Sequence, residues 1–213
     1  VFEGRRYPGG AWSTVHDVDG SNRLKMWDSL STNLSKYTCA FSDYPWADDA
    51  PTFASSGHMS RYLEGYADKY VLNNDDCTVK YGCTVTQVCS NEHDGYNVQW
   101  SDEAGKAQSK DFGGVVVASG FFSQPAMPQC ISDFVESQDY ADSGHEFVLH
   151  SSQYRSPEKF AGMNVAVVGS SFSAHEIASG VRRHAKRVIN IMGSNAPYIL
   201  PRFVPDSKSG GFL

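Results

Sequence analysis

The clearest pattern of hydrophobic and polar positions along the chain lies between residues 59 and 71. Apolar side chains recur there at i, i+3, i+4, i+7 and i+8, which places on one face Met59, Tyr62, Leu63, Tyr66, Ala67, Tyr70 and Val71. The charged residues of this segment fall largely off that face. The pattern predicts an amphipathic helix. A shorter helix is expected over residues 24–30, and a loop over the proline-containing residues 44–56.

The period of the pattern changes to two between residues 78 and 118. Residues 84–89 and 96–100 alternate in the way that strands do, with residues 91–95 as the turn between them. Residues 115–118 form a continuous apolar run, which is typical of a strand buried on both faces. Proline and glycine dominate from there to His150. The pattern therefore predicts antiparallel strands, a buried strand and then a loop-rich connection.

A second structural unit is predicted to begin near Phe160. Residues 164–168 are typical of a short buried strand, and a small-residue turn follows at once. Residues 174–186 are expected to form a helix whose inward face carries Ile177, Ala178 and Val181. Residues 187–192 form the next predicted strand. This order of strand, turn, helix and strand is how a dinucleotide-binding unit opens.

Composition narrows the class of protein. Of the 213 residues, 40% are hydrophobic and 20% charged, which excludes a disordered tail or a collagen-like repeat. The net charge of −6 leaves no electrostatic footprint for nucleic acid. No apolar run approaches the length of about 18 residues that crosses a membrane.

Cysteine usage and the first residue add two expectations. The five cysteines form no Cys-x-x-Cys pair, which argues against a disulfide framework, a zinc ribbon or a dithiol redox centre. Free cysteines indicate a reducing compartment, so the expected location is the cytoplasm. The chain begins with Val1 rather than Met, and we interpret its N-terminus as truncated.

The turn after residue 168 is a candidate phosphate-binding site. Its sequence loosely matches the Gly-x-Gly-x-x-Gly template, with Ser171 and Ala174 in two of the glycine places. Gly169 supplies the tight turn, and the two small residues allow close backbone approach and close packing of helix on strand. Amides at the helix start would hold the phosphates. Taken alone, the match is equally typical of an ordinary strand-to-helix turn.

A second candidate site lies at the N-terminus. Glu3 is predicted to end a strand just before a glycine-rich turn, where an acid commonly binds a ribose hydroxyl of a dinucleotide. The alternative interpretation is a solvated glutamate. Gly9 and Gly10 would let backbone approach a ligand, and Trp12 offers a ring to pack against it.

Several separate segments, taken in order, resemble one enzyme family. Residues 2–12 carry a strand-end Glu followed by Gly-Gly-x-Trp, and residues 30–43 carry Thr-Asn-x-x-Lys and Phe-x-Asp. Residues 61–67 resemble the helix that follows, and residues 115–125 the strand and turn that close an FAD domain. The family is that of the flavin-containing monooxygenases, which use FAD and NADPH.

The family signature reads Phe-x-Gly, five residues, His, three residues, then Phe or Tyr. Gly144, His150 and Tyr154 hold that spacing, whereas Asp142 stands in the place of the Phe. The Tyr154 ending favours this family over the related Baeyer–Villiger monooxygenases. His150 is expected to be structural, and no histidine is assigned proton transfer.

The resemblance covers essentially the whole chain and implies an α/β fold with two Rossmann-like dinucleotide-binding domains, both incomplete. Residues 1–155 would form the FAD-binding domain, with an inserted antiparallel β-meander. Residues 156–213 would begin the NADPH-binding domain. Family members start with a strand and a glycine-rich FAD turn and are longer, so we expect an internal fragment that binds FAD poorly and is inactive by itself.

The resemblance also implies roles for individual residues. The Asn that matches Asn33 lies beside the flavin ring and the nicotinamide, where its amide helps to hold a C4a-hydroperoxyflavin. The alternative is an asparagine that forms an Asx-turn. Phe172 stands where some bacterial amine-oxidising relatives have Tyr. No residue is implied as a metal ligand. The implied cofactor contacts are Glu3, Gly10, Ala11, Trp12, Thr32, Asn33, Val85, Gly169, Ser171, Phe172, Ser173, Ala174, Ser194 and Asn195.

The function implied is that of a monooxygenase that uses FAD, NADPH and O2 to oxygenate an amine nitrogen or a sulfide sulfur. A Baeyer–Villiger ketone monooxygenase and a catalytically inactive nucleotide-binding remnant are the alternatives. NADPH is expected over NADH, because residues 178–205 contain no acid and five basic residues. The expected partners are a small nucleophilic substrate and O2, without nucleic acid or a membrane segment in this chain. Membrane association through a further C-terminal segment and the oligomeric state stay open.

Overall fold

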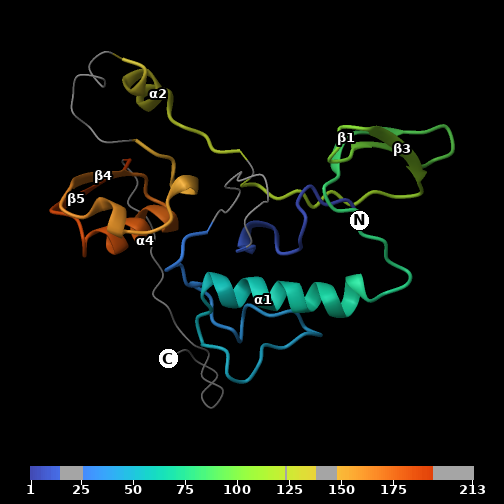
Figure 1. Cartoon of the computed structure of the whole chain (residues 1–213), viewed down its shortest axis with the longest axis horizontal. Helices are drawn as coiled ribbons and strands as arrows, with labels where there is room; N and C mark the ends of the chain where they lie inside the picture. Colours follow the sequence, from blue (N-terminus) through green and yellow to red (C-terminus); the bar gives the residue numbers. More distant parts are fainter. Residues whose placement is uncertain (15–25, 123, 138–147, 194–213) are drawn as a thin grey trace. The chain divides into compact units, whose positions relative to one another are not determined.

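The structure, a computed structural model, describes residues 1–14, 26–122, 124–137 and 148–193. The chain divides into two compact units, and each unit combines two stretches that are separate in the sequence (Figure 1). The first comprises Val1–Leu24 and Gly57–Ser123, and the second Lys25–Ser56 and Gln124–Leu213. Compactness and cofactor binding are different criteria, so the predicted binding-domain boundary after residue 155 stays a prediction.

An antiparallel meander dominates the first unit. Its strands β1 (Thr84–Ser90), β2 (Tyr96–Ser101) and β3 (Ala107–Phe112) pair in the order β1-β2-β3. The first two confirm the predicted strands, and β3 lies inside the stretch of period two. The side chain of Asn91 closes the first turn, because its Oδ1 accepts hydrogen bonds from the amides of residues 93 and 95 at 3.0 and 2.8 Å.

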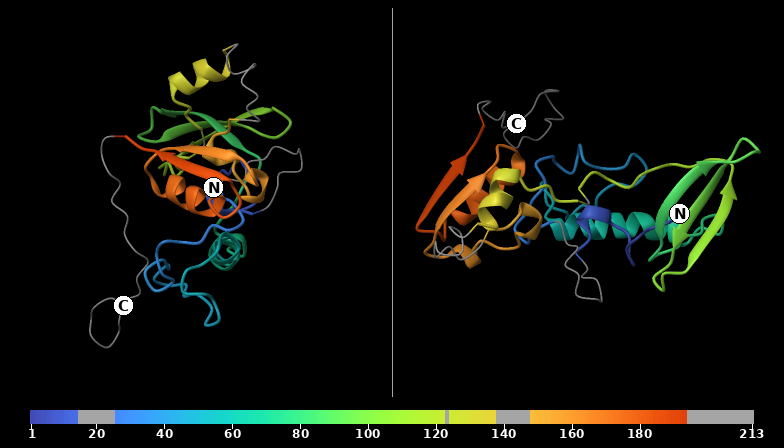
Figure 2. Two further views of the ribbon diagram at one scale, coloured as in Figure 1. Left: turned by 90° about the vertical axis from the view of Figure 1, so that its left-hand side faces the viewer. Right: turned by 90° about the horizontal axis from the view of Figure 1, so that it is seen from above.

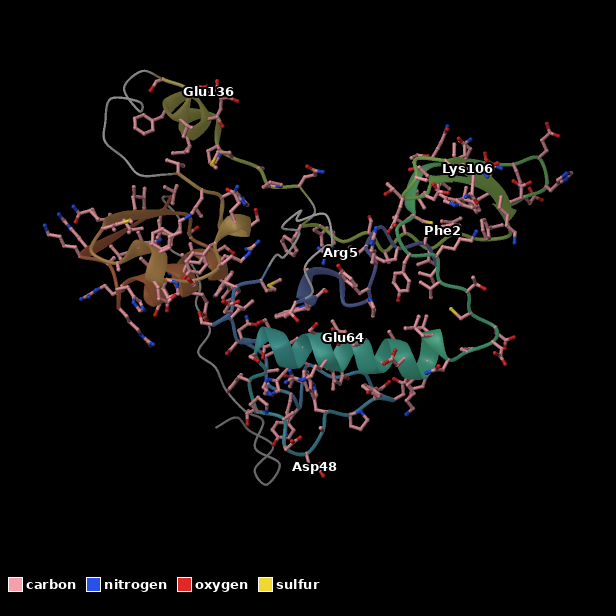
Figure 3. The ribbon with its side chains drawn as sticks, in the orientation of Figure 1. Phe2, Arg5, Asp48, Glu64, Lys106 and Glu136 are labelled. Carbon is pink, nitrogen blue, oxygen red and sulfur yellow. The ribbon has the colours of Figure 1, made fainter. Side chains whose placement is uncertain are left out.

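The meander has a small core of its own. Cys83, Val98 and Trp100 are buried, and Phe2 and Phe112 pack against them. Phe2, labelled beside the meander in Figure 3, has its ring centroid 4.6 Å from that of Trp100. Phe2 is held by a single parallel bridge to Lys80 rather than by a strand. The predicted strand before Glu3 is therefore reduced to one bridge.

The predicted amphipathic helix is confirmed as α1 (Ser56–Ala67), which continues into a π-helical turn, η2 (Asp68–Leu72). Met59 and Tyr62 are buried at 6% and 8% exposure, as their place on the apolar face requires. Farther along that face, the rings of Tyr66 and Tyr70 lie 4.8 Å apart between centroids.

A parallel βαβ arrangement lies in the second unit. Strand β4 (Asn164–Val168), helix α4 (Phe172–Val181) and strand β5 (Arg187–Ile191) confirm the predicted order. The two strands pair in parallel from Asn164↔Arg187 to Val168↔Ile191. Helix α4 lies along one face of this pair (Figure 2).

Two details of this arrangement differ from the prediction. Helix α4 ends at Val181 rather than at residue 186, because the chain must turn there to pair with Met163, whose carbonyl accepts from Lys186 N at 2.9 Å. Residues 164–168 are predicted to form a buried strand, but alternate residues of β4 and β5 are exposed. Among the described residues, only α4 of the helices covers a face of these strands.

The core of the second unit joins segments that are far apart in the sequence. Its buried residues are Trp27, Tyr154, Phe160, Ile177 and Val181. Tyr154 is 2% exposed, and its ring meets that of Trp27 edge-on at 5.7 Å between centroids. The core therefore ties residues 26–30 to α4 and to the connection that precedes β4.

Three further predictions about local structure are wrong. Residues 26–30, the described part of the expected helix 24–30, form a turn in which Leu30 N donates to Trp27 O. Burial of Trp27 in the distant core outweighs the weak helical preference of so short a segment. Residues 115–118 form no strand, and Val116 is 92% exposed. No strand of the described residues pairs with residues 115–118, so they gain no inter-strand hydrogen bonds from an extended conformation.

The third difference is a short helix in the stretch that was expected to be loop-rich, α2 (Gln129–Val135). Gln129 Nε2 donates to Asp133 Oδ1 at 2.7 Å, one helical turn apart. Two 3-10 turns, η3 (Ser151–Gln153) and η4 (Glu158–Phe160), also lie among the described residues of the second unit.

The buried phenol of Tyr154 makes a testable prediction about alkaline stability. Burial, and to a lesser degree the Glu158 carboxylate, raises the pKa of Tyr154 from 10.0 to about 12. The unfolded chain releases this proton at lower pH than the folded chain, so the contribution is complete below pH 10 and is lost as the pH rises to about 12. Tyr154→Phe should therefore lose less unfolding free energy over this range than the wild type.

The measurement is denaturant unfolding at a series of alkaline pH values. The exposed Tyr37 provides the control, because Tyr37→Phe should follow the wild-type curve. Parallel curves for Tyr154→Phe and the wild type would contradict the assignment.

Candidate functional site

The turn between β4 and α4 has the geometry that a phosphate-binding turn requires. Gly169 adopts a φ of +138°, a conformation that favours glycine, and its N–H donates to Ile191 O at 2.9 Å. A Cβ built on Gly169 would lie 3.4 Å from Cβ of Ala174, so the helix approaches the strand closely. Gly169 and Ala174 therefore fit the turn and packing roles that the sequence suggested.

Four consecutive backbone amides are exposed to a ligand at this turn. The N–H groups of Ser170, Ser171, Phe172 and Ser173 have no hydrogen-bond partner among the described residues. Ser171 is the N-cap of α4 but makes no side-chain capping bond. The positive end of the helix dipole lies at the same place. Unbonded amides at the start of a ten-residue helix can donate to an anion, so this turn is a candidate phosphate site.

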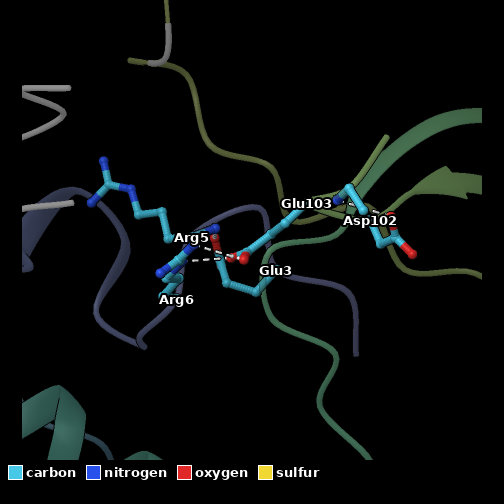
Figure 4. A network of polar contacts seen from close by, with 6 residues as sticks. Glu3, Arg5, Arg6, Asp102 and Glu103 are labelled. Carbon is cyan, nitrogen blue, oxygen red and sulfur yellow. Dashed lines mark hydrogen bonds and ion pairs between the residues drawn. The ribbon is translucent and has the colours of Figure 1, made fainter. Parts of the chain in front are cut away.

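The N-terminal turn is held by its own charged side chains (Figure 4). Glu3 Oε1 accepts a hydrogen bond from Arg5 N at 2.9 Å, and the Arg5 guanidinium donates to Gly10 O. Arg6 donates to both carboxylate oxygens of Glu103, at 2.6 and 2.7 Å. Glu3 is thus directed toward the turn that follows it, with its second carboxylate oxygen making no bond to a described residue.

The predicted Gly-Gly-x-Trp turn has the required backbone. Gly9 and Gly10 have φ values of +104° and +52°, in the left-handed region that glycine adopts readily. They lead into a 3-10 turn, η1 (Gly10–Trp12). Ala11 and Trp12 are half-buried. The following Thr14 N donates to Ser60 Oγ of α1 at 3.3 Å, which ties this turn to the helix.

Ser60 in turn donates to Glu64 Oε1 at 2.6 Å, one turn farther along α1 (Figure 3). Ser60 is only 1% exposed, so this polar contact is shielded from water. This series of hydrogen bonds from Thr14 through Ser60 to Glu64 was not predicted from the sequence, because hydroxyl-bearing residues show no periodic pattern.

Backbone hydrogen bonds and the Lys36 side chain hold the segment that carries Asn33. Thr32 N donates to Ala54 O at 2.8 Å, and Lys36 N to Thr52 O at 2.7 Å, so residues 32–36 run beside residues 52–54. Lys36 Nζ adds bonds to the carbonyls of Asp48 and Ala50 at 3.0 and 2.7 Å. These bonds hold the loop without the help of Asn33.

Asn33 itself is exposed, and its side chain makes no hydrogen bond with a described residue. The local side-chain bond is made instead by Thr32, whose Oγ1 donates to Leu34 O at 2.8 Å. The Asx-turn that was the alternative for Asn33 is not formed with described residues. Its amide is thus available to a ligand.

The candidate residues fall into two groups. The first unit carries Glu3, Gly10, Ala11, Trp12 and Val85, and the second carries Thr32, Asn33, Gly169, Ser171, Phe172, Ser173 and Ala174. Val85 is 41% exposed on β1, and Phe172 is 47% exposed at the start of α4. Ser194, Asn195, Asp142 and Gly144 lie outside the described residues. The assigned roles of all these residues stay predictions.

His150 has a structural contact of the expected kind. Its Nδ1 accepts from Ser152 N at 3.1 Å, and its own N–H donates to Gln153 Oε1 at 3.1 Å, which caps η3. Within the described part of the chain, no three His, Cys, Asp or Glu side chains gather to hold a metal ion. No helix there has the length and hydropathy to cross a membrane, and all five cysteines are free thiols.

Sequence comparison identifies relatives of known activity. The chain is 30% identical over 208 residues to dimethylaniline monooxygenase [N-oxide-forming] 2 of Cavia porcellus, covering 96% of this chain and 37% of that protein. It is 29% identical over 185 residues to the thiol-specific monooxygenase of Saccharomyces cerevisiae, covering 85% of this chain and 40% of that protein. The chain thus spans well under half the length of these curated relatives.

Comparison of structures agrees with the sequence. The S-allyl-L-cysteine S-oxygenase from Allium sativum superposes with a TM-score of 0.72 at 24% identity, over 99% of this chain and 48% of that one. This likeness confirms the predicted α/β class with Rossmann-type domains. The model of the family described as flavin-binding monooxygenase-like matches residues 1–209, and that family implies FAD and NADPH as cofactors. The chain therefore belongs to the flavin-binding monooxygenase-like family.

Proposed function

We propose that this chain is the cofactor-binding part of an NADPH-dependent, FAD-containing monooxygenase that oxygenates an amine nitrogen or a sulfide sulfur. The observation that carries the nucleotide part is the row of unbonded amides at residues 170–173, at the N-terminus of α4. The names of the relatives, an N-oxide-forming monooxygenase and a thiol-specific monooxygenase, support nitrogen and sulfur as the atoms oxygenated.

Different residues of the chain would bind NADPH, bind FAD and orient Asn33. The amides of residues 170–173 would bind the diphosphate of NADPH, and Gly169 and Ala174 let α4 begin close to β4. Glu3 and residues 10–12, with Val85, would contact FAD, since glycine backbone allows close approach. Thr32 would hold Asn33 in place beside the flavin. FAD, when bound, supplies the transfer of an oxygen atom from O2 to the substrate.

A product assay on the full-length, FAD-loaded enzyme that contains this chain tests this function. NADPH and O2 are supplied with a tertiary amine, a thioether or a cyclic ketone, and the products are identified by mass spectrometry. We expect an N-oxide and a sulfoxide, each with NADPH consumed in step. An ester from the ketone alone would favour Baeyer–Villiger oxygenation instead. No product and no substrate-dependent NADPH oxidation would indicate the inactive remnant.

The preference for NADPH over NADH is a separate prediction. Arg182, Arg183, Lys186 and Arg187 are exposed in and before β5, and an acid that would repel a 2′-phosphate is absent from residues 178–205. A charge-assisted contact to the phosphate would favour NADPH by about 1–3 kcal/mol in transition-state binding. The partners predicted for it, Ser194 and Asn195, lie outside the described residues.

The ratio of kcat/KM for flavin reduction by NADPH and by NADH measures this preference. Arg187 pairs with Asn164 at the end of the two strands away from Gly169, so Arg187→Ala should leave this ratio unchanged. Arg202→Ala tests the one basic residue of 178–205 that follows β5 in the sequence, and it should lower the ratio if its guanidinium meets the phosphate. Equal kcat/KM values for the two nucleotides in the wild type would contradict the prediction and leave the basic residues as a solvated surface.

A further inference from the structure

A polar side chain in β5 reaches across to the phosphate turn. Asn190 stands between Ile189 and Ile191, opposite Val167 of β4. Its Nδ2 donates to Val167 O at 3.3 Å and to Gly169 O at 3.1 Å. The side chain therefore adds to the backbone bond from Gly169 N to Ile191 O a second link between β5 and Gly169.

Asn190 has a cost in folding free energy at this position. Its Oδ1 is buried and has no hydrogen-bond partner among the described residues. Turning the amide over would bring this oxygen against two carbonyl oxygens, so the contacts fix the orientation observed. A buried acceptor without a partner costs stability, and a leucine of similar volume would avoid that cost. The cost of the unpaired Oδ1 therefore offsets part of what the two bonds of Nδ2 contribute to stability.

The bond to Gly169 O has a direct consequence for the neighbouring amide. The carbonyl of Gly169 and the N–H of Ser170 belong to the same peptide group, which is planar and trans, so they point in opposite directions. Holding the carbonyl toward Asn190 turns the Ser170 N–H away from β5. That N–H is the first of the four unbonded amides at residues 170–173.

Glycine makes such a restraint necessary. Gly169 has no Cβ, and its peptide group can rotate more freely than that of another residue. Its own N–H is already bonded to Ile191 O, which restrains the peptide group before it, not the one after it. Within the described residues, Asn190 supplies the hydrogen bond to the carbonyl of the following group.

We propose that Asn190 is a positioning residue for the nicotinamide nucleotide: its amide fixes the peptide group between Gly169 and Ser170, so that the amides of residues 170–173 are directed toward the diphosphate. This inference rests on the proposed function, since it assumes that the turn binds NADP(H). Asn190 acts through the backbone and has no contact of its own with the nucleotide.

Binding of two nucleotides to the FAD-loaded protein separates this role from a structural one. NADP+ contains the diphosphate, whereas adenosine 2′-monophosphate has none and cannot use these amides. Titration calorimetry of Asn190→Leu should show NADP+ affinity lowered about tenfold, with adenosine 2′-monophosphate affinity within about twofold of the wild type. The unfolding temperature should change little, because the substitution removes the unpaired buried oxygen together with the two hydrogen bonds of Nδ2.

Asn164 provides the matched control. Asn164 is exposed and begins β4, whereas the phosphate turn follows the other end of β4. Asn164→Leu should therefore leave both affinities unchanged. Unchanged NADP+ affinity in Asn190→Leu would overturn the inference. A parallel loss of both affinities would also overturn it, since that marks general damage to the unit. Failure of the wild type to bind NADP+ would instead overturn the proposed function, and the inference with it.

Discussion

Replacing Asn33 by leucine should lower the rate of product formation by about 10²–10³-fold, equivalent to about 2.7–4 kcal/mol. The substitution removes both a hydrogen-bond donor and an acceptor with little change in side-chain volume. Asn33 is exposed, and its loop is held by Thr32, Lys36 and backbone bonds instead. The loss should therefore fall on chemistry and not on folding.

The kinetic pattern identifies the step that is affected. Flavin reduction by NADPH should change much less than oxygenation, and hydrogen peroxide should appear in place of product. The measurement follows NADPH consumption, product and hydrogen peroxide together in the holoenzyme. Asn164→Leu, the same substitution at an exposed asparagine of β4, should behave as the wild type. Normal oxygenation by Asn33→Leu would show that the role assigned to Asn33 is wrong.

Truncating Trp27 to alanine should cost about 3–5 kcal/mol of unfolding free energy, the largest effect on stability that we expect. Trp27 is 6% exposed and packs edge-on against Tyr154 in the core of the second unit. Its removal leaves a cavity between residues 26–30 and α4, which the surrounding side chains fill only in part. Residues 30–36, which carry Thr32 and Asn33, begin at the edge of this core.

Denaturant unfolding of the variants measures this effect. Trp27→Phe keeps an aromatic ring and should lose a smaller share of the stability. Tyr37→Ala is the matched control, because Tyr37 lies in the same segment and is 63% exposed, so its truncation should cost little. A loss below about 1 kcal/mol for Trp27→Ala would show that this core does not depend on its ring.

The elements that the sequence predicted correctly are those whose partners lie nearby in the chain. Helix α1 shows its buried face as a repeat of three and four residues, and β1 and β2 alternate on either side of a turn of five residues. The order of β4, α4 and β5 follows from the same patterns, with Gly169 marking the turn. Periodicity records burial against a neighbouring element, which is why it was sufficient there.

Local pattern was insufficient wherever the partner is distant. The apolar run at residues 115–118 has the composition of a buried strand, yet Val116 and Val117 are exposed, because strand formation depends on neighbours and not on composition. Residues 26–30 follow Trp27 into a core made with Tyr154 and so form a turn. Neither outcome can be computed from the residues of the segment itself.

The sequence by itself determined the βαβ unit, the first two strands of the meander and the two glycine turns, since each depends on local periodicity or on the conformational freedom of glycine. The two-domain fold class and the meander as a whole were implied by the resemblance to the family. Only the tertiary structure showed that Asn33 forms no Asx-turn with described residues and that Asn190 Nδ2 donates to Gly169 O. Asn190 and Gly169 are separated by 21 residues, and parallel pairing of β4 with β5 brings them together. A single asparagine in an apolar strand carries no signal of the carbonyl that it will meet, because register across a parallel pair is set by the packing of the whole unit.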